Sequence, residues 1–588
     1  MKRKSGLSRR DFLKSGALAG AGAAGGLGAQ VAGASERGGK HRKRGTLVLV
    51  NGRIHTMDDH DRVVSAAAIR DGRFIELGRG AREVDGAKTI DLRGRTVVPG
   101  LIESHTHFVS LANRPGYHVA ELELATSIGQ VQDMLEARRR DVPPGQFITA
   151  MGGWHPRQWA EQRLPTLVEL DAAVPDRPVM LFQNFNGPCA VNSLAKAFFE
   201  TASAPLAGPV AVSATGAIAA GLQSTTALYH LRVRQSFEDK KRSALDAMAF
   251  TARVGVTTLL DQTLVAVATG PRDPQPGHPL ATLDHYRMYD GWLALHAEGK
   301  TFVRLQMNFL HNQGNIPALG GLENQLPELR ERLKNQFQFF GDDMLRTGAI
   351  GEWAAPIGAG AVWLEAQRLC AQARWRNENA ASSLAQLQQV VEAYETVHTE
   401  SIAAGFPQGI KDLRWGVQHV NFATPELLAR LKALNCSVSM SGFRWQNNLP
   451  ASLEPVGPPF RMIVDSGLPA GLHEDGVHIA PHNPWYALHY AVTGLNVFGV
   501  QVNPLSQCLS REEALRSYTR ANAWYLNRED DLGSIEEGKL ADLVVLDRDY
   551  FAVSSADLRK IQPVLTVVDG KVVHDTGALG RRHRRDED

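Results

Sequence analysis

The chain has 588 residues, of which 43% are hydrophobic and 21% charged, and its formal net charge is only +2. These proportions are typical of a soluble globular protein, and no basic stripe indicates nucleic-acid binding. The length allows one large barrel with a smaller partner domain, or three to four domains of ordinary size.

The first 34 residues have the features of an export signal. Arg9 and Arg10 stand before "DFLK" in a basic segment, and this pattern resembles the twin-arginine motif. A weakly apolar Ala/Gly-rich stretch follows, and "AGA" at 32–34 offers the small residues that a signal peptidase accepts. The stretch is too rich in glycine to match the ~20 strongly apolar residues of a membrane span. We therefore expect residues 1–34 to be a twin-arginine signal peptide; the alternative is a disordered basic tail.

Such a signal predicts passage through the twin-arginine translocation machinery to the periplasm or the medium, without stable membrane insertion. Without residues 1–34 the chain would keep 58 basic and 61 acidic side chains, a net charge of about −3. Residues 35–45 are typical of a basic linker and residues 576–588 of a disordered tail. The cysteines are far apart and lack C-x-x-C spacing, so we expect free thiols at Cys189, Cys370, Cys436 and Cys508.

Both ends of the remaining chain are rich in strand-forming residues. Asp71-Gly72 and Asp569-Gly570 are typical of tight hairpin turns. We expect one composite β-sandwich, with its first part at 46–98 and its second part, which includes a helix, at 506–575. Two independent hairpins are the alternative, but an isolated hairpin is only marginally stable in water.

Residues 99–505 alternate between short apolar runs and amphipathic helices. The runs begin near residues 147, 179, 256, 302, 414 and 436. Helix signals include a stretch at 382–405, Thr424 as an N-cap before Pro425, and a capping box in Ser510 and Glu513. This alternation predicts an α/β fold with a parallel sheet, and its span favours a (β/α)8 TIM barrel over several Rossmann units. No Gly-rich nucleotide-binding motif follows any of these runs.

The segment "VVPGLIESHTHF" at 97–108 contains two histidines at a spacing of two. On a strand, His105 and His107 would face the same side, at the carboxyl end where barrel enzymes build their sites. Two imidazoles can begin a divalent metal site, although a metal needs further ligands. The alternative is that two histidines fall close together by chance.

The same segment resembles the first-strand signature of the amidohydrolase superfamily. Further stretches resemble its family 3 branch, the N-substituted formamide deformylase-like enzymes: "LVNGRIHTMD", "GGWHPRQW", "PFRMIVDSGLPAGLHEDG" and "LGSIEEGKLADLVVLDRDYF". The resemblance extends over nearly all of 46–575. It implies a composite β-sandwich around a (β/α)8 barrel, in agreement with the strand pattern.

The resemblance also implies roles for individual residues. His105 and His107 match metal ligands, and His419 in "RWGVQHVNF" matches a ligand or carbonyl-polarising histidine. Asp475 matches an aspartate that contacts the metal and moves a proton from the attacking water to the leaving amine. These four residues would hold one divalent ion, with zinc as the expected metal, and Asp475 and His419 would be catalytic. Three further side chains stand near Asp475: Glu474 at a usual Ser or Thr position, and His473 and His478 as spare donors.

Several positions depart from the family pattern. Arg346 stands at the usual lysine position and Ile350 at that of an aspartate, and a guanidinium cannot form a carbamate bridge between two metals. Glu352 could supply a carboxylate instead, although in a different register. Asn379 lies nearest to an expected fifth-strand histidine, and Pro188 replaces another histidine. These departures argue against a binuclear centre and leave open whether one metal binds.

The sequence thus predicts an exported hydrolase that cleaves an amide-like, non-peptide C–N bond of a small molecule with a metal-activated water. The main alternative is a metal-poor relative that binds a small ligand, and an isomerase or C–O hydrolase on the same scaffold stays open. Four residues after predicted strands could line a substrate pocket or only pack: Trp154, Trp159, Arg444 and Trp445. Neither the substrate nor the oligomeric state follows from the sequence.

Overall fold

The computed structural model of the protein describes residues 45–183, 187–205, 207–262, 286–311, 314–442, 457–476 and 480–580. The predicted signal peptide, nearly all of the predicted linker and most of the predicted tail lie outside these ranges. The candidate residues Arg444, Trp445 and His478 lie outside them as well.

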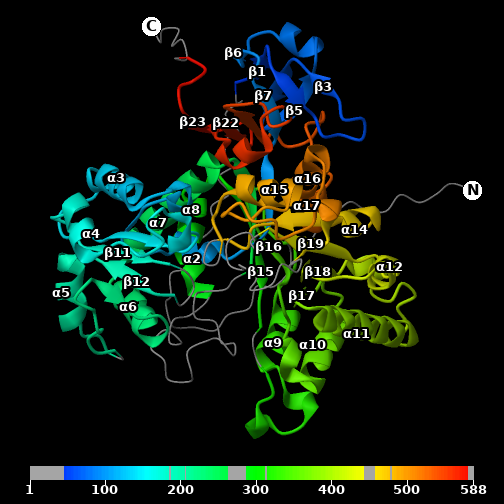
Figure 1. Ribbon diagram of the computed structural model, residues 1–588. Helices are drawn as coiled ribbons and strands as arrows, with labels where there is room; N and C mark the ends of the chain where they lie inside the picture. Colours follow the sequence, from blue (N-terminus) through cyan, green and yellow to red (C-terminus); the bar gives the residue numbers. More distant parts are fainter. Residues whose placement is uncertain are drawn as a thin grey trace, which may run out of the picture. The chain divides into compact units, whose positions relative to one another are not determined.

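Strands from the two ends of the chain share one sheet (Figure 1). This six-stranded sheet has the order β23-β22-β21-β7-β2-β3, and β7 pairs antiparallel with β21. A second, four-stranded sheet has the order β5-β4-β1-β6. Their strands are β1 (Leu47–Val50), β2 (Arg53–His55), β3 (Val63–Val64), β4 (Ala67–Arg70), β5 (Arg73–Leu77), β6 (Lys88–Asp91), β7 (Thr96–Pro99), β21 (Leu543–Leu546), β22 (Pro563–Val568) and β23 (Lys571–Asp575).

The two hairpin turns lie where the sequence predicts them. Asp71 and Gly72 join β4 to β5 with φ values of 51° and 83°, and Asp569 and Gly570 join β22 to β23 with 54° and 69°. Two positive φ values in a row are the geometry that suits Asp-Gly in a two-residue hairpin. Apolar residues of both sheets then pack in one core, for example Leu49 with Val97 and Val545.

Eight parallel strands form the central part of the structure. One sheet has the order β16-β15-β14-β8 and the other β17-β18-β19-β20. Isolated parallel bridges join their edges, one between Ile350 and Asn377 and one between Thr106 and Gly476. The strands are β8 (Leu101–Thr106), β14 (Val256–Asp261), β15 (Arg304–Phe309), β16 (Leu345–Ile350), β17 (Glu378–Ala381), β18 (Gly416–His419), β19 (Ser437–Ser441) and β20 (Ala470–His473).

A helix comes before each strand from β14 to β20. These helices are α7 (Phe237–Arg253), α8 (Asp290–Ala297), α9 (Pro327–Asn335), α10 (Ala361–Gln372), α11 (Leu384–Ala403), α12 (Pro425–Ala433) and α14 (Phe460–Asp465); α15 (Pro484–Thr493), α16 (Arg511–Tyr518) and α17 (Arg520–Tyr525) follow β20. The expected caps are present, because Thr424 accepts from the amide of Leu427 and Ser510 and Glu513 form a capping box. Among the described residues, none of the helices combines the length and the apolarity needed to cross a bilayer.

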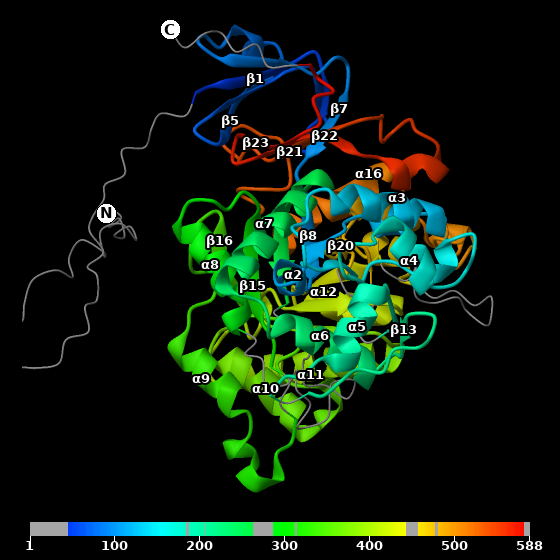
Figure 2. The ribbon, with the colours of Figure 1, turned by 90° about the vertical axis from the view of Figure 1, so that its left-hand side faces the viewer.

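A separate mixed sheet is inserted between β8 and β14, in the order β13-β12-β11-β10-β9 (Figure 2). Its strands are β9 (Tyr117–His118), β10 (Ile148–Met151), β11 (Val179–Phe182), β12 (Cys189–Val191) and β13 (Ala217–Ile218), and this stretch also contains α2 (Phe108–Ala112), α3 (Ile128–Arg139), α4 (Leu167–Ala173), α5 (Ser193–Thr201) and α6 (Leu222–Arg232). The apolar runs near 147 and 179 therefore belong here and not to the eight-strand set. A short buried run predicts a strand but does not say which sheet it joins.

Two tryptophans that could line a substrate pocket lie in this region. Trp154 and Trp159 stack with ring centroids 5.1 Å apart in the core of the inserted sheet, and each is 1% exposed. They therefore pack in this core. Pro188 immediately precedes β12 in the same unit. All four cysteines of the chain are free thiols, and Cys508 alone among them is not fully buried.

Candidate metal centre

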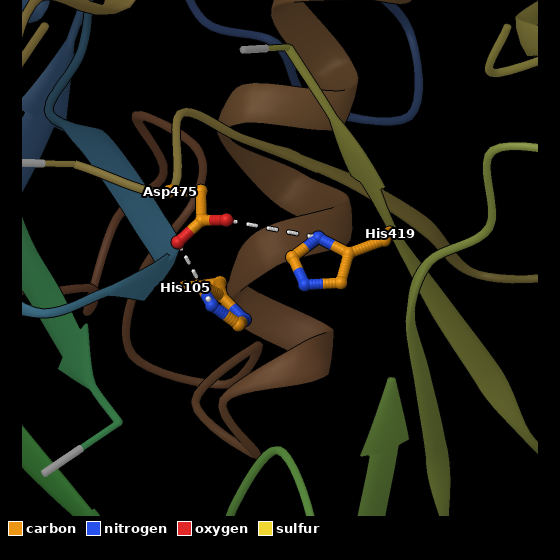
Figure 3. Close-up of side chains that lie close together, drawn as sticks. All are labelled: His105, His419 and Asp475. Atoms are coloured by element: carbon orange, nitrogen blue, oxygen red, sulfur yellow. Dashed lines mark ion pairs between the residues drawn. The ribbon is translucent and has the colours of Figure 1, made fainter. Parts of the chain in front are cut away.

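Five ionisable side chains converge at the carboxyl ends of the parallel strands. His105 lies on β8 and His107 just after it, Glu352 lies two residues after β16, His419 ends β18, and Asp475 lies two residues after β20. Each is at most 6% exposed. Figure 3 shows three of them, His105, His419 and Asp475, facing one another.

Four of their atoms have the spacing of ligands around one ion. Asp475 Oδ1 lies 3.2 Å from His105 Nε2 and 3.2 Å from His107 Nε2. Glu352 Oε2 lies 3.8 Å from each of the same two nitrogens. A tetrahedral site with metal–ligand bonds of about 2.1 Å has ligand–ligand distances of about 3.4 Å. The distances from the two carboxylate oxygens to the two imidazole nitrogens are therefore compatible with ligands of such a site.

Three of the four atoms lack a conventional partner. His105 Nε2, Glu352 Oε2 and Asp475 Oδ1 are buried and have no hydrogen-bond partner among the described residues. Leaving such groups unsatisfied is costly, and a divalent cation satisfies an imidazole nitrogen and a carboxylate oxygen together. The same side chains belong to the groups whose ligand atoms can hold an ion: His105, His107 and Glu352, and His105, His419 and Asp475. These nitrogen and oxygen donors fit a divalent metal.

His419 lies beside the other oxygens of the two carboxylates. Its Nε2 is 3.1 Å from Glu352 Oε1, and its Nδ1 is 3.9 Å from Asp475 Oδ2. Its Nδ1 is also 2.7 Å from Ser441 Oγ on β19. This histidine can act as a further ligand or as a group that polarises a carbonyl, the two roles expected for it.

The charges of the site favour a cation at its centre. Burial alone would lower the pKa of His105, but the neighbouring carboxylates of Asp475 and Glu352 raise it to about 9. Burial would raise the pKa of Asp475, whereas the positive charge on His105 holds it well below its usual range. The two carboxylates therefore favour a positive charge beside them.

The backbone at the site is strained at three positions. His419, Val420 and Asp475 have φ values of 68°, 45° and 61°, a region that residues other than glycine seldom adopt. Such conformations cost on the order of 1–3 kcal/mol each and cluster at functional sites. Two of the three are members of the converging set.

Glu103, on β8, ties two of the ligand-bearing segments together. Its Oε1 accepts the backbone N–H of His105 at 3.2 Å and that of Glu474 at 3.1 Å, and its Oε2 accepts the hydroxyl of Tyr518. Glu474 itself faces His482, with Oε2 3.3 Å from the Nδ1 of that ring. His473 stacks on His105 at 4.7 Å, and burial together with the charges of His105 and His419 holds its pKa well below its usual value.

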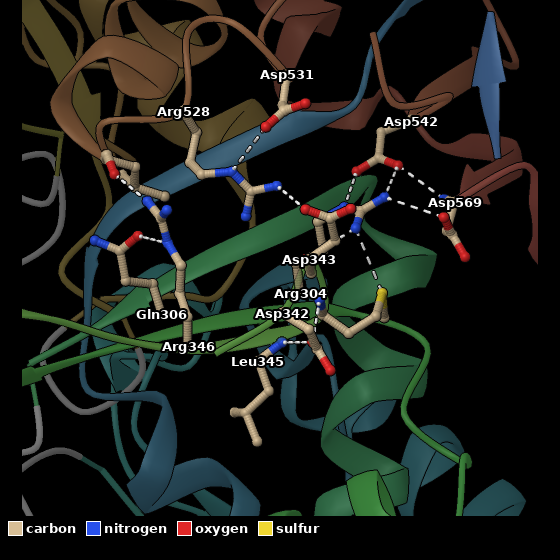
Figure 4. Close-up of polar contacts among 12 residues, drawn as sticks. Arg304, Gln306, Asp342, Asp343, Leu345, Arg346, Arg528, Asp531, Asp542 and Asp569 are labelled. Atoms are coloured by element: carbon tan, nitrogen blue, oxygen red, sulfur yellow. Dashed lines mark hydrogen bonds and ion pairs between the residues drawn. The ribbon is translucent and has the colours of Figure 1, made fainter. Parts of the chain in front are cut away.

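Arg346 does not lie at the site, contrary to the expectation from the family pattern. It is the second residue of β16, at the opposite end of the strand from Glu352. Its guanidinium donates to Gln306 Oε1 at 2.8 Å and to the carbonyl of Leu526 at 2.5 Å (Figure 4). Glu352 supplies the carboxylate from this strand, and Ile350 is the last residue of the strand itself.

Asn379 also points away from the converging set. Its side-chain oxygen accepts from Trp363 Nε1 at 3.1 Å, and its amide donates to Gln367 and Tyr394 at 2.8 and 3.0 Å. These partners lie on α10 and α11, so this side chain joins the strand to the surrounding helices. The sequence signal that could have identified Glu352 is its position two residues after a strand, a position that Asp475 shares.

Comparison with known proteins assigns the chain to a family. The amidohydrolase family profile matches residues 88–574. The chain belongs to the amidohydrolase family. It is 26% identical over 558 residues to the N-substituted formamide deformylase of Arthrobacter pascens, a match that covers 89% of this chain and 97% of that protein.

Solved structures share the fold at low sequence identity. A metal-dependent hydrolase of Pyrococcus horikoshii OT3 has a TM-score of 0.55 and 18% identity, with 87% of this chain and 99% of that chain covered. A mutant atrazine chlorohydrolase of Arthrobacter aurescens, complexed with zinc and atraton, has a TM-score of 0.50 and 17% identity, with 90% and 95% covered. This amidohydrolase therefore has the mixed α/β fold of known metal-dependent hydrolases.

Proposed function

We propose that this amidohydrolase uses one divalent metal ion to hydrolyse an amide-like, non-peptide C–N bond in a small molecule. The observation that carries the proposal is the group of four ligand atoms on His105, His107, Glu352 and Asp475. The relative from Arthrobacter pascens is named for deformylation of N-substituted formamides, which supports a substrate with an acylated nitrogen.

Zinc is the metal we propose, since imidazole and carboxylate ligands suit it and a structural neighbour is complexed with zinc. A bound zinc ion would polarise the scissile carbonyl and lower the pKa of a bound water towards about 7. His105, His107 and Glu352 would serve only to hold the ion. His419 is placed to hold it as well, or to donate from Nε2 to the carbonyl oxygen.

Asp475 is the proposed proton carrier. It takes a proton from water while the water oxygen forms its bond to the carbonyl carbon, and it gives this proton to the leaving nitrogen as the C–N bond breaks. Its Oδ1 faces the two imidazoles, which leaves Oδ2, on the side of His419, to carry the proton. The products are a carboxylic acid and an amine.

Two further expectations belong to this proposal. We propose that the eight parallel strands are a closed (β/α)8 barrel, supported by the bridges at both seams between the two sheets. We also propose export through the twin-arginine pathway, supported by the paired arginines and the small-residue site in residues 1–34.

Metal analysis tests the centre. Protein produced with zinc available should contain one zinc per chain, and the double variant His105→Ala/His107→Ala should contain none. His489→Ala removes another buried histidine, on α15, and should leave the zinc content unchanged. A wild-type protein without stoichiometric metal would sink the proposal and favour a metal-poor ligand-binding protein.

Turnover tests the reaction. Wild-type protein with zinc should release formate and amine from at least one of a set of N-substituted formamides, or the corresponding acid and amine from other N-acyl compounds. Glu352→Ala should lose both zinc and turnover. Hydrolysis that persists in metal-free protein would contradict the mechanism.

A further inference from the structure

A buried carboxylate lies among the strands but outside the converging set. Glu378 is the first residue of β17 and is 1% exposed. Its Oε2 accepts from Asn308 Nδ2 at 3.0 Å, from Gln262 Nε2 at 3.3 Å and from Gln418 Nε2. Its Oε1 is 3.5 Å from Arg376 Nε. Three amide side chains, one on β15, one on β18 and one just after β14, therefore turn their donors to one oxygen.

Gln418 connects Glu378 to a proposed ligand. Its side-chain oxygen contacts His105 Nδ1, and its nitrogen donates to Glu378. Because an amide has one acceptor oxygen and one donor nitrogen, the carboxylate determines which end faces the imidazole. The Nδ1–H of His105 then donates to Gln418, and Nε2 is the nitrogen directed at Asp475 and Glu352.

Gln262 connects Glu378 to a second proposed ligand. Its nitrogen donates to Glu378, and its oxygen accepts the backbone N–H of Glu352 at 3.0 Å. Asn308 makes the same two kinds of bond, because its nitrogen donates to Glu378 and its oxygen accepts the backbone N–H of Ala349 on β16 at 2.8 Å. The same carboxylate thereby orients the amides that hold the segment carrying Glu352.

We propose that Glu378 is a positioning residue of the metal centre, which acts through Gln418 on the ring of His105 and through Gln262 on the backbone of Glu352. This inference rests on the proposed metal site. Groups that orient ligands from behind typically contribute roughly 10- to 100-fold to metal affinity. In Glu378→Gln the new side chain offers a donor where three donors converge or, when turned round, an uncharged oxygen. In the first case Gln418 loses the acceptor that orients it, and in the second it keeps only an uncharged and therefore weaker acceptor.

The test compares the zinc affinities of metal-free full-length proteins, measured by competition with a chelator. Glu378→Gln should bind zinc roughly 10- to 100-fold more weakly than wild type. The matched control is Asn379→Ala, because this neighbour is equally buried on the same strand but bonds outward to Trp363, Gln367 and Tyr394. Both variants should lose thermal stability, while only Glu378→Gln should lose zinc affinity.

An NMR measurement separates positioning from general destabilisation. The Nδ1 proton of His105 should give a downfield resonance that Asn379→Ala retains and Glu378→Gln shifts or loses. If Glu378→Gln does not fold, Gln418→Met breaks the same connection at similar length and should show the same two changes.

Equal zinc affinity in wild type and Glu378→Gln, or equal weakening in Asn379→Ala, would overturn this inference and leave the proposed function intact. A wild type that binds no zinc would overturn both.

Discussion

Both ends of the parallel strands carry many charged side chains, but the two ends differ in whether these side chains have hydrogen-bond partners. At the carboxyl ends, His105, Glu352 and Asp475 present buried atoms that have no hydrogen-bond partner in the described part of the chain. At the opposite ends, Arg304 forms two parallel bonds to Asp542, at 2.8 and 2.9 Å, and Arg528 pairs with Asp343 at 3.1 Å (Figure 4). Paired charges serve the fold, whereas carboxylate oxygens and an imidazole nitrogen that converge without hydrogen-bond partners indicate a site for a cation.

The two ends also differ in where their charged residues stand relative to the strands. Asp542 lies just before β21, so its bonds to Arg304 join the start of β15 to a strand of the six-stranded terminal sheet. Glu352 and Asp475 follow their strands and face the other way. In parallel α/β folds, the carboxyl ends of strands carry chemistry and the opposite ends carry stability.

The largest expected effect is at the carboxyl ends. Asp475→Asn removes the proposed proton carrier, so turnover with saturating zinc should fall about 10²- to 10⁴-fold, the usual contribution of general acid–base catalysis. Steady-state kinetics on a compound that wild type cleaves will measure it. Undiminished turnover in a zinc-loaded variant would assign the proton transfers to another group.

At the opposite ends of the strands, Arg304→Met should lower the free energy of unfolding and leave zinc binding unchanged. The Arg304 side chain is 1% exposed and that of Asp542 is 4% exposed, so the variant leaves a buried carboxylate without its cation. We expect a loss of about 3–5 kcal/mol in the free energy of unfolding, measured by urea denaturation. Arg163→Met is the control, because Arg163 makes a similar two-bond pair with Glu169 at an exposed site and should cost less than about 1 kcal/mol.

Arg346→Met sharpens the comparison within one strand. The variant loses the bonds to Gln306 and to the carbonyl of Leu526, which should lower the free energy of unfolding by about 1–3 kcal/mol. Zinc affinity should not change, because Glu352 and not Arg346 lies at the site. Clearly tighter zinc binding in the variant would place the guanidinium beside the ion after all.

The smallest effect concerns a partly exposed ion pair away from both ends. The pKa of Glu513 falls from 4.5 to about 2, mainly because its carboxylate accepts hydrogen bonds from Arg461. Burial opposes this shift, and further hydrogen bonds from Ser510 add to it. Since the folded pKa lies below the unfolded one, this stabilisation is present above pH 4.5 and is lost as the pH falls towards 2. With solvent screening, Glu513→Gln should cost about 1 kcal/mol at pH 7 and almost nothing near pH 2. A loss that is equal at both pH values in urea denaturation would show that the charge is not its cause.

Local patterns predicted much of what is observed. The Asp-Gly turns, the cap at Thr424 and the capping box of Ser510 depend on neighbours a few residues apart, so the chain itself contains the information. Asp475 lies within 3.2 Å of both His105 and His107, as the family resemblance implied. The sequence leaves the role of Glu352 open, because a difference of a few residues in register cannot be seen without the strand's end.

The errors have one physical origin. The family resemblance matched Arg346 and Asn379 to positions of metal ligands, but it did not say which end or which face of a strand each residue occupies. Side chains alternate along a strand and two ends present different environments, so a small error in register moves a residue from the site to the helices or to the opposite end.

The sequence by itself determined the hairpins, the helix caps, the His-x-His pair and the family, because each depends on residue identity over short spacings. Only the tertiary structure decided that Glu352 joins the converging side chains, that Arg346 and Asn379 do not, and that Glu378 lies behind two members of this set. These decisions depend on distances between strands far apart in the chain, which are established only when the strands pair.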